Sequence, residues 1–120
     1  MGKAIAIFNQ KGGVGKTTTN INLAACLAKK GKKILVLDID PQGNTTSGLG
    51  IEKKALKKSS YDLMIEDDIN AEDVILKTGV DNLDIIPANV SLSGAEVELA
   101  IIRGREKRLK KALNQVKEKY

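Results

Sequence analysis

The stretch that decides the fold runs Gln10-Lys11-Gly12-Gly13-Val14-Gly15-Lys16-Thr17-Thr18-Thr19. Before it stands the continuous apolar run Ala4-Ile5-Ala6-Ile7-Phe8, of the kind that a strand buried on both faces needs. After it, apolar residues recur at helical spacing from Ile21 to Ala28, and Gly31 marks the end of the predicted helix. Glycines between a strand and a helix are typical of a phosphate-binding loop, and a flexible turn is the plain alternative.

Each residue type in this loop suits a chain of phosphates. The glycines allow the backbone to curl so that several N–H groups point inward. The helix that begins near Lys16 adds its unpaired N–H groups and the positive end of its dipole. Lys16 is predicted to reach the β- and γ-phosphates, and the hydroxyl of Thr17 to coordinate Mg²⁺. Thr18 is a predicted further donor to phosphate.

The loop departs from the general pattern G-x-x-x-x-G-K-[ST]. Gln10 occupies the first glycine position, and a second lysine, Lys11, precedes the glycine pair. The sequence KGGVGKTT resembles the deviant Walker A loop of the ParA/MinD superfamily of ATPases. That resemblance implies an ATP-dependent homodimer in which Lys11 reaches across the interface to the ATP of the partner subunit. The residues expected to bind ATP are Lys11, Gly12, Gly13, Val14, Gly15, Lys16, Thr17 and Thr18.

A second apolar run, residues 34–40, ends in two acids and predicts a second buried strand. Pro41 stops this strand, and residues 42–50 are predicted to form a long polar loop. Asp38 and Asp40 would share one face of the strand, where a buried carboxylate is costly unless it is paired or works on a metal. Because ligands of open parallel sheets bind beyond the carboxyl ends of the strands, Asp40 is predicted to lie beside the phosphate loop. For Asp38, a structural acid hydrogen-bonded to the loop is an equally good interpretation.

The end of this strand carries Asp40-Pro41-Gln42-Gly43-Asn44, which closely resembles the second motif of ParA/Soj-type chromosome- and plasmid-partitioning ATPases. The resemblance extends over essentially the whole chain, from Lys3 to Tyr120. It implies that Asp40 orients or polarises the attacking water and contacts Mg²⁺ through water. The expected catalytic residues are therefore Lys11, Lys16 and Asp40, and the expected metal-binding residues are Thr17 and Asp40.

The same resemblance implies an enzyme that hydrolyses ATP with Mg²⁺ and drives chromosome or plasmid segregation. Its ATP-bound dimer would bind DNA non-specifically, and a ParB-type DNA-binding partner would stimulate hydrolysis. Such a protein is expected in the cytoplasm, on the nucleoid and not at a membrane. Two alternatives stay open. One is a MinD-like positioning ATPase, which the Asp-Pro-Gln-Gly-Asn stretch disfavours, and the other is a nucleotide-gated binding module that does not itself turn over.

The order strand–helix–strand predicts a βαβ unit and therefore a parallel sheet. The expected fold class is α/β, a doubly wound parallel sheet like that of P-loop NTPases. A third strand is predicted over residues 83–86, and helices over residues 60–66, over 70–77 with Asn70 as N-cap, and from Ser93 to Gly104. The apolar face of a last helix is marked by Leu109, Ala112, Leu113, Val116 and Tyr120.

The family carries a third motif, the Walker B strand ending in Asp and two prolines, and these 120 residues do not contain it. In the family that strand lies between the strands of the first two motifs. Residues 1–120 are therefore expected to form the N-terminal half of a single P-loop ATPase domain, truncated before the Walker B strand. The residues that contact adenine, and most of those that hold DNA, would then lie beyond residue 120.

The basic charge of the chain belongs to its last helix. The net charge is +5, and residues 103–120 hold eight Lys or Arg against two Glu. A solvated helix face is the favoured interpretation, and contact with DNA phosphates is the alternative. The chain has no histidine and one cysteine, which excludes a histidine-based triad and a disulfide within the chain. No apolar run reaches the length of a membrane span.

Overall fold

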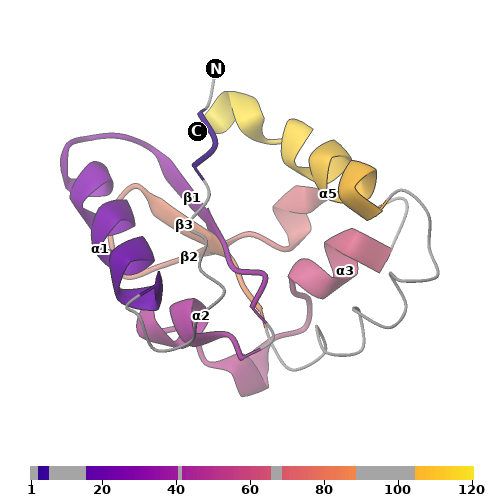
Figure 1. The fold of residues 1–120 in the computed structure, drawn as a ribbon, viewed down its shortest axis with the longest axis horizontal. Coiled ribbons are helices and arrows are strands. Elements are labelled where there is room, and N and C mark those ends of the chain that lie inside the picture. Colours follow the sequence, from indigo (N-terminus) through magenta and orange to yellow (C-terminus); the bar gives the residue numbers. More distant parts are fainter. Residues whose placement is uncertain (1–2, 6–15, 41, 66–68, 89–104) are drawn as a thin grey trace.

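The computed structural model of the chain describes residues 3–5, 16–40, 42–65, 69–88 and 105–120. The helices are α1 (Lys16–Lys29), α2 (Asn44–Gly48), α3 (Ser60–Ile65) and α5 (Arg105–Asn114), and the strands are β1 (Ile34–Leu37), β2 (Leu76–Lys77) and β3 (Leu83–Ile86). Single 3-10 turns span Lys53–Ala55, Ala71–Asp73 and Lys117–Lys119. The sheet lies between α1 on one face and α3 and α5 on the other, so the described part has three layers (Figure 1).

The described strands form one sheet in the order β1-β3-β2. β1 runs parallel to β3, with Ile34 opposite Leu83 and Leu37 opposite Ile86. Parallel neighbours need a crossover, and the chain makes it through α2 and α3. β2 is antiparallel to β3, a pairing that the sequence did not predict. The parallel pair confirms the predicted α/β class.

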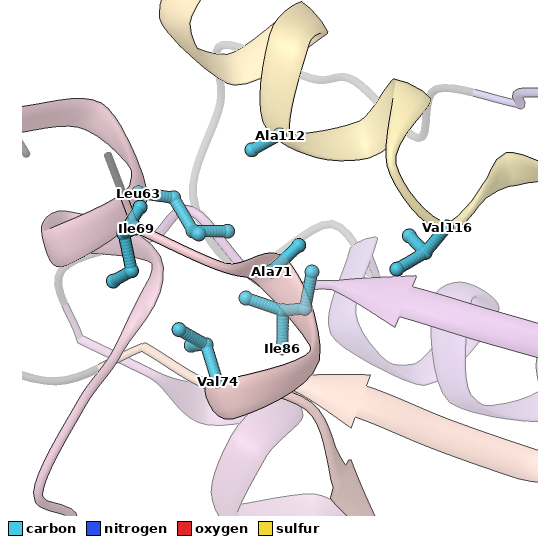
Figure 2. Close-up of a cluster of buried hydrophobic side chains, with 7 residues drawn as sticks. All are labelled: Leu63, Ile69, Ala71, Val74, Ile86, Ala112 and Val116. Atoms are coloured by element: carbon cyan, nitrogen blue, oxygen red, sulfur yellow. The ribbon is translucent and has the colours of Figure 1, made fainter. Parts of the chain in front are cut away.

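The side chains of β1 and β3 alternate between the two faces of the sheet. On one face Val36, Leu83 and Ile85 are buried, and they pack against Ala24 and Ala28 of α1. A second buried cluster fills the other face, with side chains from α3, α5 and the segment before β2 (Figure 2). Its members are Leu63, Ile69, Ala71, Val74, Ile86, Ala112 and Val116. Because both faces are covered by helices, the doubly wound arrangement is also confirmed.

Three predicted helices occur close to their expected positions. α1 begins at Lys16, and the chain leaves it through Gly31, whose φ of 85° favours glycine. α3 matches the prediction over residues 60–66 to within one residue. In α5 the apolar face is buried as expected, but the helix ends at Asn114 and continues only as a 3-10 turn. The lysines at positions 107, 110 and 111 are exposed, as both the solvated face and a contact with DNA phosphates require.

The helix predicted over residues 70–77 is wrong beyond its first turn. Asn70 caps that turn as expected, because its side chain accepts a hydrogen bond from the N–H of Glu72 at 3.1 Å. The chain then leaves the helix and enters β2. β-Branched Val74 and Ile75 have low helix propensity, and pairing with β3 gives the following backbone a ladder of hydrogen bonds.

Two expectations around residue 40 also need correction. β1 ends at Leu37 and not at residue 40, because its partner β3 stops at Ile86, before Pro87. One further bond extends the ladder, from the N–H of Asp38 to the carbonyl of Ile86 at 3.1 Å. The long loop expected over residues 42–50 contains α2.

The first predicted strand covers residues 4–8, and no strand forms in the part of this range that the structure describes. Ala4 and Ile5 belong to no strand, and Ile5 is 65% exposed. None of the described strands pairs with them. Residues 6–8 and the helix expected from Ser93 lie outside the described residues. Among the helices that are described, none has the length and apolar character needed to cross a membrane.

Candidate functional site at the carboxyl edge of the sheet

Polar groups gather where β1 and β3 end. Asp38 follows β1 directly, and its side chain is only 4% exposed. A carboxylate buried to this extent is costly unless hydrogen bonds replace the water that it has lost. The partners of its two oxygens therefore decide what this residue does.

Both oxygens of the Asp38 carboxylate accept hydrogen bonds. Oδ1 accepts from the N–H of Asp40 at 3.1 Å. Oδ2 accepts from the N–H of Thr46 at 2.9 Å and from the Thr46 hydroxyl at 2.6 Å. The Thr46 oxygen accepts in turn from the N–H of Ala88 at 2.9 Å. Asp38 is therefore a structural acid, as one of the two sequence interpretations holds, and its described partners lie in the segment after β1 and not in the phosphate loop, which is outside the described residues.

Ser60, the first residue of α3, adds a further segment to this arrangement. Its hydroxyl donates to the carbonyl of Asp38 at 2.7 Å, and its N–H donates to the carbonyl of Pro87 at 2.8 Å. Ser60 and Thr46 are both 0% exposed. One buried network thus joins the end of β1, α2, the start of α3 and the residues that follow β3.

α2 begins where it does because of Asp38. Its sequence, Asn44-Thr45-Thr46-Ser47-Gly48, contains no strong helix former. The N-cap residue, Gly43, has a left-handed φ of 64° and no side chain that could cap the helix. Asp38 accepts instead from Thr46, the third residue of α2, whose N–H has no partner within the helix. A carboxylate at this end also interacts favourably with the helix dipole.

Asp40 lies just beyond Asp38 and is half-buried. Its Oδ1 accepts from the N–H of Gln42 at 3.0 Å, and its carbonyl accepts from the N–H of Gly43 at 2.9 Å. These two bonds form a tight turn of the kind that aspartate favours. The backbone of Asp40 is therefore held on one side by Asp38 and on the other by its own turn.

The start of α1 lies at the same edge of the sheet. The short connection through Gly31 turns the chain back into β1, so α1 and β1 run in opposite directions and the first turn of α1 lies near the end of β1 (Figure 1). Lys16 and Thr17 open α1, and Thr18 is exposed in its first turn. α2 packs against the next turn, because Gly48 contacts Ile21.

The other predicted site residues lie outside the described residues. These are Lys11, Gly12, Gly13, Val14 and Gly15, together with the side chains of Lys16 and Thr17. The structure therefore brings the start of α1 and Asp40 to one edge, while the contact between Asp40 and the glycine loop stays a prediction.

Sequence reasoning missed Thr46 and Ser60. Thr46 stands in a polar segment without hydrophobic periodicity. Ser60 opens the helix predicted over residues 60–66, but nothing in the sequence singles out its hydroxyl among several. The signal that could have found these two residues is Asp38. A buried carboxylate needs hydrogen-bond donors, and serine and threonine hydroxyls can supply them.

The chain matches the family model described as an AAA domain over residues 2–120. It is 59% identical over 120 residues to the sporulation initiation inhibitor protein Soj of Bacillus subtilis (strain 168). That alignment covers 100% of this chain and 47% of the Bacillus protein.

Two solved structures are similar in fold. Cobyrinic acid a,c-diamide synthase from Mycobacterium smegmatis, with bound ADP and magnesium, has a TM-score of 0.93 at 36% identity, over 100% of this chain and 48% of that chain. The cell division ATPase MinD of Pyrococcus furiosus has a TM-score of 0.78 at 30% identity, over 100% of this chain and 47% of that chain. The chain thus spans about half the length of the proteins it matches.

Proposed function

Because the chain belongs to the AAA-domain family of ParA/Soj-type ATPases, we propose that the protein binds ATP with Mg²⁺ and hydrolyses it to drive the partitioning of DNA. The observation that carries the proposal is the 59% identity to Soj over the whole chain. The geometry supports it, since the start of α1 and Asp40 lie at one edge of the sheet. The similar structure with bound ADP and magnesium supports the choice of nucleotide and metal.

In this proposal the loop of residues 11–15 and the start of α1 hold the phosphates. Backbone N–H groups and the positive end of the α1 dipole face the negative charge. Lys16 neutralises the β- and γ-phosphates from within the same subunit, and the hydroxyl of Thr18 donates a further hydrogen bond. Asp40 orients the water that attacks the γ-phosphate. Phosphoryl transfer of this kind depends on positioning and on charge neutralisation more than on covalent chemistry by protein groups.

The residues proposed for Mg²⁺ offer the hard oxygen donors that this ion prefers. Thr17 would supply its hydroxyl directly, and Asp40 would contact the ion through water. The half-buried position of Asp40 at the carboxyl edge of the sheet fits such an outer contact. The ion would neutralise charge that develops on the phosphates.

The proposal extends to an ATP-dependent homodimer. Lys11 would reach across its interface to the ATP of the partner subunit. The dimer would bind DNA non-specifically on the nucleoid, in the cytoplasm, and a ParB-type partner would stimulate hydrolysis. Residues 1–120 are proposed to belong to a single P-loop domain.

A MinD-like positioning ATPase is the second candidate, favoured by the similarity to MinD of Pyrococcus furiosus. The lower identity of that match, 30% against 59% for Soj, makes partitioning the better proposal. A nucleotide-gated module that does not turn over is the third.

Phosphate release by the full-length protein separates these functions. Wild-type protein is expected to hydrolyse ATP with Mg²⁺, faster with duplex DNA and a ParB-type partner than alone. Lys16→Ala is expected to lose ATP binding, because the loop loses its main charge aimed at the phosphates. Lys29→Ala, at the exposed far end of the same helix, is the matched control and should bind ATP normally.

Each alternative has its own outcome in this experiment. ATP binding without turnover under any condition would favour the nucleotide-gated module. Stimulation by lipid vesicles and not by DNA would favour the MinD-like function. If Lys16→Ala keeps its ATP affinity within about threefold, which is under about 1 kcal/mol, the assignment of the loop is wrong.

A further inference from the structure

The buried network around Asp38 has no role in the function proposed above, yet it adjoins the residue proposed to act on the water. Thr46 stands at its centre, with one hydroxyl that both donates to Asp38 at 2.6 Å and accepts from Ala88 at 2.9 Å. The hydroxyl of Thr46 therefore acts both as a donor and as an acceptor within the network. Thr46 is 0% exposed, so this hydroxyl lies in the interior of the fold.

The network bears on Asp40 through one carboxylate. Oδ2 of Asp38 binds Thr46, and Oδ1 of the same carboxylate accepts from the N–H of Asp40 at 3.1 Å. Rotation of the Asp38 side chain away from Thr46 would break both sets of bonds together. The hydroxyl of Ser60 holds the backbone of Asp38 from the other side, at its carbonyl. Thr46 and Ser60 thus hold Asp38 in place, and Asp38 in turn holds the backbone N–H of Asp40.

The same helix also contacts α1. Gly48 lies against Ile21, so α2 is held between the helix that follows the glycine loop and the turn that carries Asp40. Thr46 therefore acts on the distance and orientation between two parts of the proposed site. A displacement of about 1 Å in such a pair can cost a reaction about a hundredfold in rate.

We propose that Asp38 and Thr46 are positioning residues for ATP hydrolysis, which hold Asp40 in place against the start of α1, with Ser60 as their support. This inference rests on the proposed ATPase function. Neither residue touches the nucleotide in this proposal, so both act on the rate of the chemical step and leave ATP affinity nearly unchanged.

Single-turnover hydrolysis by the full-length protein tests this role, because its amplitude and its rate constant report different things. The amplitude measures the fraction of molecules that are folded and bound to ATP, and the rate constant measures the chemical step in those molecules. A purely structural role would lower the amplitude alone. A positioning role lowers the rate constant at full amplitude.

Three substitutions in α2 form a matched set. Thr46→Val keeps the shape but removes the hydroxyl, and is expected to lower the rate constant about tenfold or more, with ATP affinity within about threefold. Thr46→Ser restores the hydroxyl and should return the rate constant to within about threefold of wild type. Thr45→Val is the control, since Thr45 is also buried in α2, at 6% exposed, but takes no part in the bonds that join Asp38, Thr46 and Ala88.

Ser60→Ala is a second test of the positioning role, which can be used even if Thr46→Val fails to fold. It removes only the hydrogen bond to the Asp38 carbonyl and is expected to lower the rate constant about threefold or more. An unchanged rate constant in the folded variants, with only the amplitude reduced, would overturn the inference and leave the proposed function standing. A wild-type protein that binds ATP but never hydrolyses it would overturn the proposed function and this inference with it.

Discussion

Ile21 of α1 and Gly48 of α2 lie so close that a Cβ on Gly48 would overlap Cδ1 of Ile21. A glycine at this position allows the two helices to touch directly. α2 is also bonded to Asp38 through Thr46, at the carboxyl end of β1. The contact between Ile21 and Gly48 therefore links α1 to the segment that carries Asp40, and it sets how closely the two helices can approach.

Gly48→Val is expected to destabilise the fold by about 1 kcal/mol, because the added side chain must displace Cδ1 at the flexible end of Ile21. Ile21→Ala should cost less in that background than in wild type, with a coupling of about 1 kcal/mol, since the smaller side chain removes the clash. Chemical denaturation of the four proteins measures this cycle. Gly79→Val is the control, because a Cβ there meets no atom within 4 Å. Additive effects at Gly48 and Ile21 would contradict the contact.

Much of the fold could be predicted from local patterns. α1, β1 and β3 have strong hydrophobic periodicity or continuous apolar runs, and their ends carry clear signals such as Gly31 and Pro87. These signals depend only on neighbouring residues, and so the sequence contains them in full.

The elements that were missed depend on distant partners. α2 contains no good helix former and begins where the carboxylate of Asp38 accepts from Thr46. β2 exists because β3 offers its free edge, which outweighs the helical start that Asn70 provides. For the same reason the role of Asp38 stayed open in the sequence. Only the folded chain brings the hydroxyls of Thr46 and Ser60 to it.

The hydroxyl of Tyr120 bonds the end of the described chain to the sheet, and its removal is expected to lower the free energy of unfolding. Its hydroxyl donates to Oδ2 of Asp84 in β3 at 2.7 Å. Tyr120→Phe removes this hydrogen bond and keeps the ring, so we expect a loss of about 1 kcal/mol in the free energy of unfolding near neutral pH. Thermal or chemical denaturation of the two proteins gives the difference.

The same contact predicts a pH dependence. Burial, the hydrogen bond to Asp84 and the charge of Asp84 raise the pKa of Tyr120 above its ordinary value. The unfolded chain releases this proton near pH 10, while the folded chain still holds it. The contribution of Tyr120 to the free energy of unfolding is therefore fully present below about pH 10 and declines as the pH rises further. Tyr120→Phe should lack that decline, and an equal alkaline loss in both proteins would contradict the assignment.

Lys11→Ala tests the proposed action across the dimer interface. Because Lys16 and the backbone of the same subunit supply most of the contacts to ATP, the variant should bind ATP with nearly unchanged affinity. Its ATP-dependent dimerisation and turnover should fall, since the partner's phosphates lose a positive charge. Analytical ultracentrifugation with ATP and phosphate release measure the two effects. Lys3→Ala, at an exposed position, is the control. Normal dimers with normal turnover would show that Lys11 does not act in trans.

Asp40→Ala separates catalysis from nucleotide binding. In the proposed site, ATP is held by backbone N–H groups, Lys16 and Mg²⁺, and the carboxylate of Asp40 matters chiefly when water attacks the γ-phosphate. Its removal is expected to lower kcat by about a hundredfold or more with little change in ATP affinity. A dimer that separates only after hydrolysis would then accumulate, bound to ATP and to DNA. Nucleotide binding, sedimentation and phosphate release measure these effects, with Asp73→Ala at an exposed turn as the control. Equal losses of ATP binding and turnover would show that Asp40 holds the site together through its turn, and its catalytic role would then be wrong.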